Sequence, residues 1–280
     1  MRVFGLLACL LSLSAFAESK LITTQIYDID YGTKSDDDVL VLLTSGDVAK
    51  LNRSDLNLLP DNNKSFVNND WYEIKLDGDR FIKKAKRVPE PERSYLKSLL
   101  NDPTEYIPTT VESMEVAKKY HKEARLYAKD SQCFNRAMVW SYEWWKKHSL
   151  KSNKILIYWT RNYIRRYNFQ WWFHIAPLLN VMDNGEVVER VMDIKYTKGP
   201  LTIQQWTNIF MRNKAVCQVI TKYSEYADYP YTGDCYIQRT NMYVLQPADL
   251  QMEEAWGYKK THFIMDEVRA SYLEAFNERI

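Results

Sequence analysis

Short apolar stretches alternate with polar turns over the first third of the chain. Four of these stretches have the length and residue types of strands; they are 21–29, 39–43, 70–74 and 80–84. The turns between them are polar, and most contain glycine. We therefore predict a small β-rich domain over residues 18–105. A proline-containing connector closes it, and a short helix is predicted there over 95–100.

Helical periodicity replaces this pattern after residue 108. An apolar stripe over 116–127 predicts a helix that begins at a cap on Thr109 or Thr110 and ends near Asp130. A second helix is predicted over 132–147, with Asp130 or Ser131 as its N-cap. Apolar residues occupy more than one side of this second helix, so we expect it to be largely buried.

Strands and two further helices are predicted in the remainder of the chain. Continuous apolar or alternating stretches of strand length are 155–160, 167–182, 187–196 and 235–245. Thr202 and Gln205 form a capping box ahead of one helix, and the last helix is predicted from about His262. The basic run of Arg161, Arg165 and Arg166 is interpreted as a solvated strand face.

The dipeptide Asn184-Gly185 predicts a tight hairpin between two of these strands. If the two residues form the loop, the numbers of opposing residues sum to 369, and His174 opposes Lys195. Asp193 then lies diagonally from His174 on the same face of the sheet. A three-residue loop would place the two side chains on opposite faces, and Pro177 is compatible with a bulge.

Composition narrows the class of protein. An apolar fraction of 46% over 280 residues is enough for a substantial core. The net charge of +2 gives no global field to attract nucleic acid or an anionic membrane, so neither partner is expected. The four histidines lack metal-ligand spacing, which argues against a zinc enzyme, and no cofactor is expected.

The N-terminus has the pattern of a signal peptide. Arg2 precedes an apolar run over 3–13, and Ala15-Phe16-Ala17 has the small-x-small form of a cleavage site. We expect residues 1–17 to be removed after Ala17 and the mature protein to be secreted or periplasmic. Lipidation at Cys9 is the alternative, but Cys9 lies too early in the run. No later stretch reaches the roughly 18 apolar residues of a membrane span, so a soluble monomer is expected.

Export changes the interpretation of the cysteines. The mature chain keeps Cys133, Cys217 and Cys235, and an odd number leaves a free thiol or a cross-link between chains. Cys217 and Cys235 flank a turn-rich segment, and a disulfide between them would contribute about 3 kcal/mol through loop entropy. Cys133 is then the unpaired cysteine, either a buried apolar residue or a reactive one.

The position of Cys133 favours the reactive alternative. It lies in the first turn of a predicted helix, where unpaired N–H groups and the helix dipole stabilise a thiolate. A thiolate nucleophile needs a histidine to exchange protons with and a carboxylate to orient the ring. Cys133, His174 and Asp193 are the candidates for these three roles. Such a trio also occurs by chance in globular chains, so the residues alone do not establish the site.

An ordered series of motifs resembles the bacterial protein-glutaminase family. The matching segments are Cys133-Phe134-Asn135-Arg136-Ala137, Trp172-Phe173-His174-Ile175-Ala176, Val191-Met192-Asp193-Ile194 and Gly199-Pro200-Leu201-Thr202 with Trp206. The resemblance covers roughly residues 108–245. Ile194 departs from it, because many relatives have a proline there.

The resemblance implies an α+β fold with a transglutaminase or papain-like core. A helix bearing Cys133 would pack on an antiparallel sheet bearing His174 and Asp193, within a catalytic domain over 106–280. It implies deamidation of protein-bound glutamine through a thioester on Cys133, without a cofactor. The expected partners are proteins or peptides with exposed glutamine. The β-rich segment over 18–105 would be a pro-segment covering the active site or an accessory domain.

Two other functions remain open at this point. A transglutaminase or papain-like protease uses the same three residues on another acceptor or amide bond. An exported binding protein could keep the fold without turnover.

Overall fold

The computed structural model describes residues 19–33, 38–59, 70–89, 106–128, 131–257 and 259–280. The chain divides into two compact units, one formed by Met1–Val41 and Ala49–Pro89, the other by Leu42–Val48 and Glu90–Ile280. The predicted signal peptide and the predicted helix over 95–100 lie outside the described residues. The predicted domain boundary at 105 also falls there and stays a prediction.

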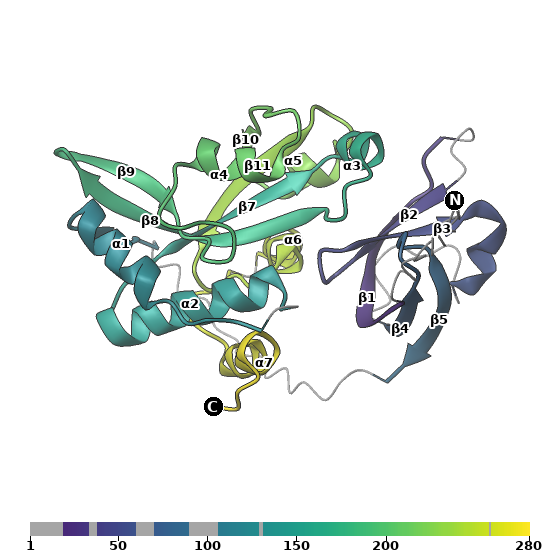
Figure 1. Cartoon of the computed structure of the whole chain (residues 1–280), viewed down its shortest axis with the longest axis horizontal. Coiled ribbons are helices and arrows are strands. Elements are labelled where there is room, and N and C mark those ends of the chain that lie inside the picture. The colour runs from purple at the N-terminus through teal and green to yellow at the C-terminus, as the bar shows by residue number, and fades with distance from the viewer. Residues whose placement is uncertain (1–18, 34–37, 60–69, 90–105, 129–130, 258) are drawn as a thin grey trace, which may run out of the picture. The chain divides into compact units, whose positions relative to one another are not determined.

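The first unit is built on a five-stranded sheet with the order β3-β2-β1-β4-β5 (Figure 1). Its elements are β1 (Lys20–Asp30), β2 (Asp38–Leu43), β3 (Val48–Asn52), a 3₁₀ helix (Arg53–Leu58), β4 (Trp71–Leu76) and β5 (Ile82–Val88). β4 pairs antiparallel with both β1 and β5. Alternate residues such as Ile22 and Ile74 face each other across the sheet and are buried. The four predicted strands are therefore present, and β3 is an additional one.

The second unit contains a six-stranded mixed sheet. The strands are β6 (Thr110–Val111), β7 (Asn153–Trp159), β8 (Phe173–Asp183), β9 (Glu186–Val191), β10 (Gln218–Ile220) and β11 (Cys235–Asn241). The order is β10-β11-β7-β8-β6, and β9 pairs with β8. The central pairs are antiparallel, whereas β6 and β10 join in parallel. The described chain is thus mixed α+β, as predicted.

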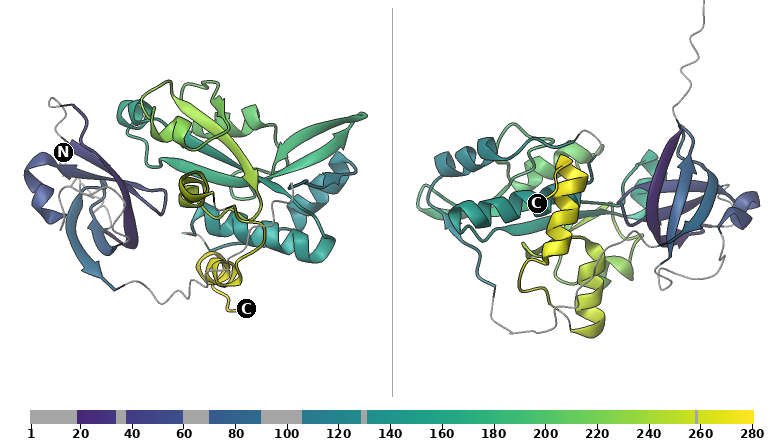
Figure 2. Two further views of the ribbon diagram at one scale, coloured as in Figure 1. Left: turned by 180° about the vertical axis from the view of Figure 1, so that it is seen from behind. Right: turned by 90° about the horizontal axis from the view of Figure 1, so that it is seen from below.

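Seven helices surround this sheet among the described residues. They are α1 (Met114–Glu123), α2 (Cys133–His148), α3 (Arg161–Tyr167), α4 (Ile203–Phe210), α5 (Ser224–Ala227), α6 (Pro247–Trp256) and α7 (Met265–Phe276). In Figure 1, α2 and α7 lie below the sheet, with α3 and α4 above it, and Figure 2 shows α7 alongside α2. The sheet is therefore covered on both faces, which explains why β7 and β8 are almost entirely apolar and buried.

A tight apolar cluster fixes α1 and α2 against β8. Trp140 and Trp144 of α2 pack there with Leu179 and Val181 of β8, and all four are almost fully buried. Fully burying a large apolar side chain contributes about 1.5–3 kcal/mol. This cluster therefore anchors the helix whose first residue is Cys133.

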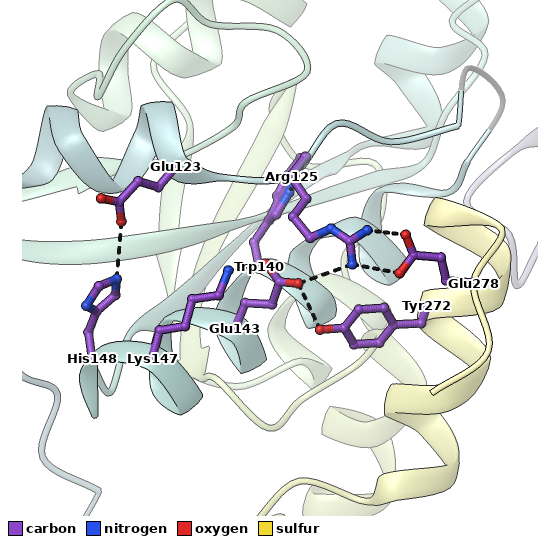
Figure 3. A network of polar contacts seen from close by, with 8 residues as sticks. All are labelled: Glu123, Arg125, Trp140, Glu143, Lys147, His148, Tyr272 and Glu278. Carbon is purple, nitrogen blue, oxygen red and sulfur yellow. Dashed lines mark hydrogen bonds and ion pairs between the residues drawn. The ribbon is translucent and has the colours of Figure 1, made fainter.

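A polar network holds α2 to α7 on the opposite side of the helix (Figure 3). The Glu143 carboxylate, almost fully buried, accepts hydrogen bonds from Tyr272 at 3.0 Å, Lys147 at 3.3 Å and Arg125 at 3.5 Å. Arg125 also forms a two-pronged ion pair with Glu278. Because a buried carboxylate is costly unless paired, these bonds specify how the two helices meet.

Several predicted boundaries are wrong, for reasons that involve distant residues. α1 begins only after the N-cap Ser113, not at Thr109 or Thr110, since Thr110–Val111 pair with Asn180–Val181 of β8. α2 is capped by Gln132, not by Asp130 or Ser131.

The basic run over 161–166 is a helix, not a strand face. Thr160 caps α3, and its hydroxyl accepts a hydrogen bond from the N–H of Tyr163. Arg161 is buried against Tyr226, so only part of the run faces solvent.

The hairpin prediction is correct in register but not in extent. Asn184 and Gly185 both have positive φ, at 52° and 85°, as a two-residue turn requires. Every pair from Asp183↔Glu186 to Leu178↔Val191 sums to 369. β9 then ends, and His174 pairs with Ile157 of β7 instead of Lys195. The predicted capping box of Thr202 and Gln205 is present at the start of α4.

Cys217 and Cys235 form the expected disulfide, and Cys133 is a free cysteine. The bond ties the residue before β10 to the first residue of β11. Within the described ranges, no helix combines the length and apolar character needed to span a membrane.

Candidate active site

Cys133 is the first residue of α2 and is half-buried. No side-chain cap occupies the helix start, because the N-cap residue Gln132 makes no capping hydrogen bond. The first N–H groups of a helix have no partner within it and carry its positive dipole end. The sulfur of Cys133 therefore lies in a position that stabilises negative charge.

His174 and Asp193 meet by a route other than a continuous hairpin. His174 lies on β8 and is 3% exposed, while Asp193 lies two residues after the end of β9 and is 1% exposed. The N–H of Met192 donates to the carbonyl of Pro177, which keeps the chain beside β8 after the pairing ends. As a result, His174 Nε2 lies 2.7 Å from Asp193 Oδ2. A carboxylate only accepts, so Nε2–H is the donor.

Trp206 of α4 completes the environment of this carboxylate. Its Nε1–H donates to the same Oδ2 atom of Asp193 at 2.9 Å, and its indole is fully buried. The motif series contains Trp206, but the sequence gives this residue no role beside the carboxylate. Its motif position near Thr202 is the one signal that could have suggested a second role.

The Cys133 side chain lies close enough to the His174 side chain and to the backbone of Ile175 for both to lower its pKa. The structure therefore brings all three residues predicted from the sequence into one chain of contacts, Cys133 to His174 to Asp193.

The electrostatics of the three groups favour a charged pair. Burial raises the pKa of the Cys133 thiol, but His174 and then Arg136 outweigh it, and the net direction is downward. Burial lowers the pKa of His174, but Asp193 and Cys133 together raise it to about 9. Burial raises the pKa of Asp193, but His174, the hydrogen bond from Trp206 and the charge of Arg136 together lower it. These directions favour the thiolate and imidazolium over the neutral pair, and they favour the ionised carboxylate.

Aromatic rings enclose the imidazole. The ring of His174 stacks on Trp171 and Trp206, with centroids 6.2 and 5.8 Å apart. Tyr196 and Phe210 contact it at 5.3 and 4.8 Å. The neighbouring Trp172 is fully buried, so Trp171 is the partly exposed member of that pair. The rings exclude water from His174 and leave one indole accessible beside it.

Residues 109–210 match the protein-family model described as Glutaminase. The match contains Cys133, His174, Asp193 and Trp206, and it supports the resemblance stated from the sequence. A search of curated proteins found no significant match.

Two solved structures show the same fold as this chain. One is described as the crystal structure of pro- protein-glutaminase, with a TM-score of 0.51, 13% identity, and coverage of 80% of this chain and 83% of the other. The A47Q2 mutant of pro- protein-glutaminase gives a TM-score of 0.52 with the same identity and coverage. At 13% identity, the likeness shows a shared fold.

A turn after β9 holds the backbone of Asp193 in place. The carbonyl of Asp193 accepts hydrogen bonds from the N–H groups of Tyr196 and Thr197 and from the Thr197 hydroxyl, each at 3.0 Å. His121 of α1, which is 7% exposed, places Nε2 3.0 Å from that hydroxyl. Since 76 positions separate His121 from Thr197, no local pattern could have predicted this contact.

A short loop lies against the start of β8. Residues 42–48 belong to the same unit as the site, although they come from the N-terminal part of the chain. The N–H of Val48 donates to the carbonyl of Gln170 at 2.8 Å, and the N–H of Trp172 donates to the carbonyl of Gly46 at 3.0 Å. Asp47 and Trp171 form an antiparallel bridge. The loop thus pairs with the backbone next to the partly exposed Trp171.

Among the residues that the structure describes, no group of three His, Cys, Asp or Glu side chains is placed to hold a metal ion. The site chemistry described above uses only protein side chains and backbone.

Proposed function

We propose that this chain hydrolyses the side-chain amide of protein-bound glutamine to glutamate and ammonia. The observation that carries the proposal is the contact chain of Cys133, His174 and Asp193 within a segment that matches the Glutaminase family. The three residues supply a nucleophile, an acid-base group and an orienting carboxylate in the arrangement that acyl transfer requires.

The first half of the proposed reaction forms a thioester. The Cys133 thiolate attacks the carboxamide carbon, and the resulting oxyanion is held by backbone N–H groups at the start of α2, with Gln132 beside them. The bond between carbon and nitrogen then breaks as the His174 imidazolium donates its proton to the nitrogen, and ammonia leaves. Asp193 stays ionised and fixes the ring orientation throughout.

The second half returns the enzyme to its starting state. The now neutral His174 takes a proton from water, and the oxygen attacks the thioester carbon. The bond between carbon and sulfur breaks, which releases glutamate and regenerates the thiolate and the imidazolium. No oxidant or cofactor enters the balance.

The proposal includes the core architecture. We assign residues 106–280 to a transglutaminase or papain-like catalytic domain. Its support is the packing of the α2 helix, with Cys133 at its start, against the β8 strand that bears His174.

The N-terminal segment is proposed to restrain the site, and the chain is proposed to act outside the cytoplasm. The backbone pairing of residues 42–48 with 170–172 supports a covering loop, and one structure with the same fold is described as a pro- form. The disulfide between Cys217 and Cys235 is typical of an oxidising compartment and supports export through a signal peptide over 1–17.

Substitution of the nucleophile tests the function. Cys133→Ser should reduce ammonia release from a glutamine-containing protein by at least about 10³-fold, because a hydroxyl is not ionised by this environment. His174→Gln should act similarly. His148→Gln is the matched control, because His148 lies at the other end of α2, paired with Glu123, and should retain activity.

Mass spectrometry of the protein substrate distinguishes the related reactions. Deamidation replaces the amide NH₂ by OH, a transglutaminase leaves a cross-link, and a protease leaves a cut. Full activity of Cys133→Ser, or products of the second or third kind only, would refute the proposed reaction.

A further inference from the structure

Arg136 is a buried cation one helical turn after Cys133. It is 2% exposed and lies on α2. Its Nη1 group donates to the carbonyl and the hydroxyl of Ser131, and its guanidinium lies 5.4 Å from the centre of the Tyr127 ring. Arg136 belongs to the Cys-x-x-Arg-Ala motif, but the reaction proposed above gives it no role.

No carboxylate in the described part of the chain forms an ion pair with Arg136, and no described group accepts a hydrogen bond from its Nε–H. A buried guanidinium without a carboxylate is costly. By contrast, the buried cation Lys260 bonds Asp249 at 2.8 Å and Glu267 at 2.7 Å. Within the described residues, the charge of Arg136 is therefore compensated by groups that are not formal ion-pair partners.

The candidate site supplies that compensation. With Cys133 and Asp193 ionised and His174 protonated, these three groups sum to −1, and Arg136 brings the sum to zero. Burial raises the pKa of Cys133, and Arg136 contributes, after His174, to the effects that lower it. Arg136 also contributes to the lowering of the pKa of Asp193. It also opposes the rise that burial produces in the pKa of Tyr196.

We propose that Arg136 is a positioning residue whose buried charge holds Cys133 as a thiolate and balances the two anions of the site. Its bonds to Ser131 fix the guanidinium at the approach to α2, so the charge stays one turn from the sulfur. The catalytic use of the thiolate rests on the proposed function. The effect of Arg136 on the Cys133 thiol does not, and it can be measured without a substrate.

Other ionisable groups near the site come from several elements of the fold. His174 comes from β8, and Asp193 and Tyr196 come from the turn after β9. Lys195 of that turn lies 5.5 Å from the same Tyr127 ring but is partly exposed, so solvent screens its charge more strongly. Burial lowers the pKa of His121, and the charge of Asp193 partly opposes this effect. Removal of Arg136 leaves all of these in place.

The test is the pH dependence of Cys133 alkylation by iodoacetamide in the full chain. Cys217 and Cys235 are joined in a disulfide, and mass spectrometry of the peptide that contains Cys133 separates its labelling from that of Cys9. Arg136→Met should raise the midpoint of the labelling profile by one pH unit or more, which is about a tenfold loss of rate below the midpoint. Arg136→Lys, which keeps the charge, should stay within about threefold of the unchanged protein.

Arg161→Met is the matched control. Arg161 is also a buried arginine stacked on a tyrosine, 5.7 Å from the Tyr226 ring, but it contributes to no shift at Cys133, His174 or Asp193. Its profile should not move. Circular dichroism establishes folding of each variant, and Arg136→Gln, which retains a donor toward Ser131, takes the place of the methionine variant if that variant is unfolded.

Two results would overturn the inference: an unchanged midpoint in Arg136→Met or Arg136→Gln, or an equal rise in Arg136→Lys, which would indicate a role in packing. Failure of the proposed function is distinguishable from both. If the protein releases no ammonia from glutamine while the midpoint of the labelling profile shifts as expected, the role of Arg136 is supported and the proposed deamidation is refuted.

Discussion

At the residue scale, the proposed reaction depends on the protonation of His174. It is the acid that releases ammonia in the proposed reaction, and its pKa of about 9 leaves it protonated at neutral pH. Activity should therefore be retained through neutral pH and fall as the pH rises past about 9, because the proton needed by the leaving group is lost.

Asp193→Asn tests this prediction. The amide removes the negative charge that opposes the effect of burial, so the pKa of His174 should fall and the alkaline limb of kcat/KM should move to lower pH. The measurement is ammonia release from a glutamine peptide across pH 5–10, for the unchanged protein and the variant. An alkaline limb at the same pH in both would contradict the assignment.

The candidate site was predictable from the sequence only in part. Cys133, His174 and Asp193 were singled out by a helix start, a hairpin and a motif series, and the structure brings them into contact. The hairpin arithmetic placed Asp193 on a strand, however, whereas it lies beyond the end of β9. Trp206 and His121 approach Asp193 from other elements, and such contacts between distant parts of a chain leave no local signal.

At the element scale, the attachment of α2 to its neighbours can be tested at Glu143. Removing a buried carboxylate with three donors leaves Tyr272 and Arg125 partly without partners (Figure 3). Glu143→Ala should lower the free energy of unfolding by about 2–4 kcal/mol. Urea or thermal unfolding measures this.

Glu123→Ala is the control for that substitution. Glu123 pairs with His148 at 3.2 Å near the surface, so its removal should cost less than about 1 kcal/mol. Equal losses in the two variants would show that the buried network does not secure α2.

Element types were easier to predict than their ends. The apolar periodicity of α2 and the Asn184-Gly185 turn were sufficient, because each is a local property. The start of α1 was not predictable in this way, since Thr110–Val111 pair with Asn180–Val181 of β8. The segment of α3 was predicted as a strand face, although its cap Thr160 is a local feature.

At the scale of the whole molecule, residues 42–48 pair with the backbone of residues 170–172 within the second unit. Gly46 has φ +89°, and a Cβ there would lie 3.1 Å from the ring of Phe173. Gly46→Val should displace the loop from β8, because the left-handed conformation costs a non-glycine residue about 1–2 kcal/mol and the ring blocks the added carbon. If the loop restrains the site, deamidation by the full chain should increase.

Gly233→Val is the matched control for the loop. Gly233 also has positive φ, +68°, but nothing lies within 4 Å of a Cβ built on it, so activity should stay unchanged. Comparison of initial rates for the three full chains measures the effect. Unchanged activity in Gly46→Val would argue against a restraining loop.

The α+β class and the β-rich N-terminal segment were predictable from periodicity and turn residues. The grouping of 42–48 with the second unit was not, because it depends on backbone pairing with 170–172 that no side-chain pattern encodes.

The stacking of two indoles on His174 has an optical consequence. An imidazolium accepts an electron from an excited indole far more readily than a neutral imidazole, so Trp171 and Trp206 should emit weakly while the ring is charged and brighten when it loses its proton. Light emitted by the protein itself would then reveal the ionisation of its buried histidine, in the absence of any substrate or label.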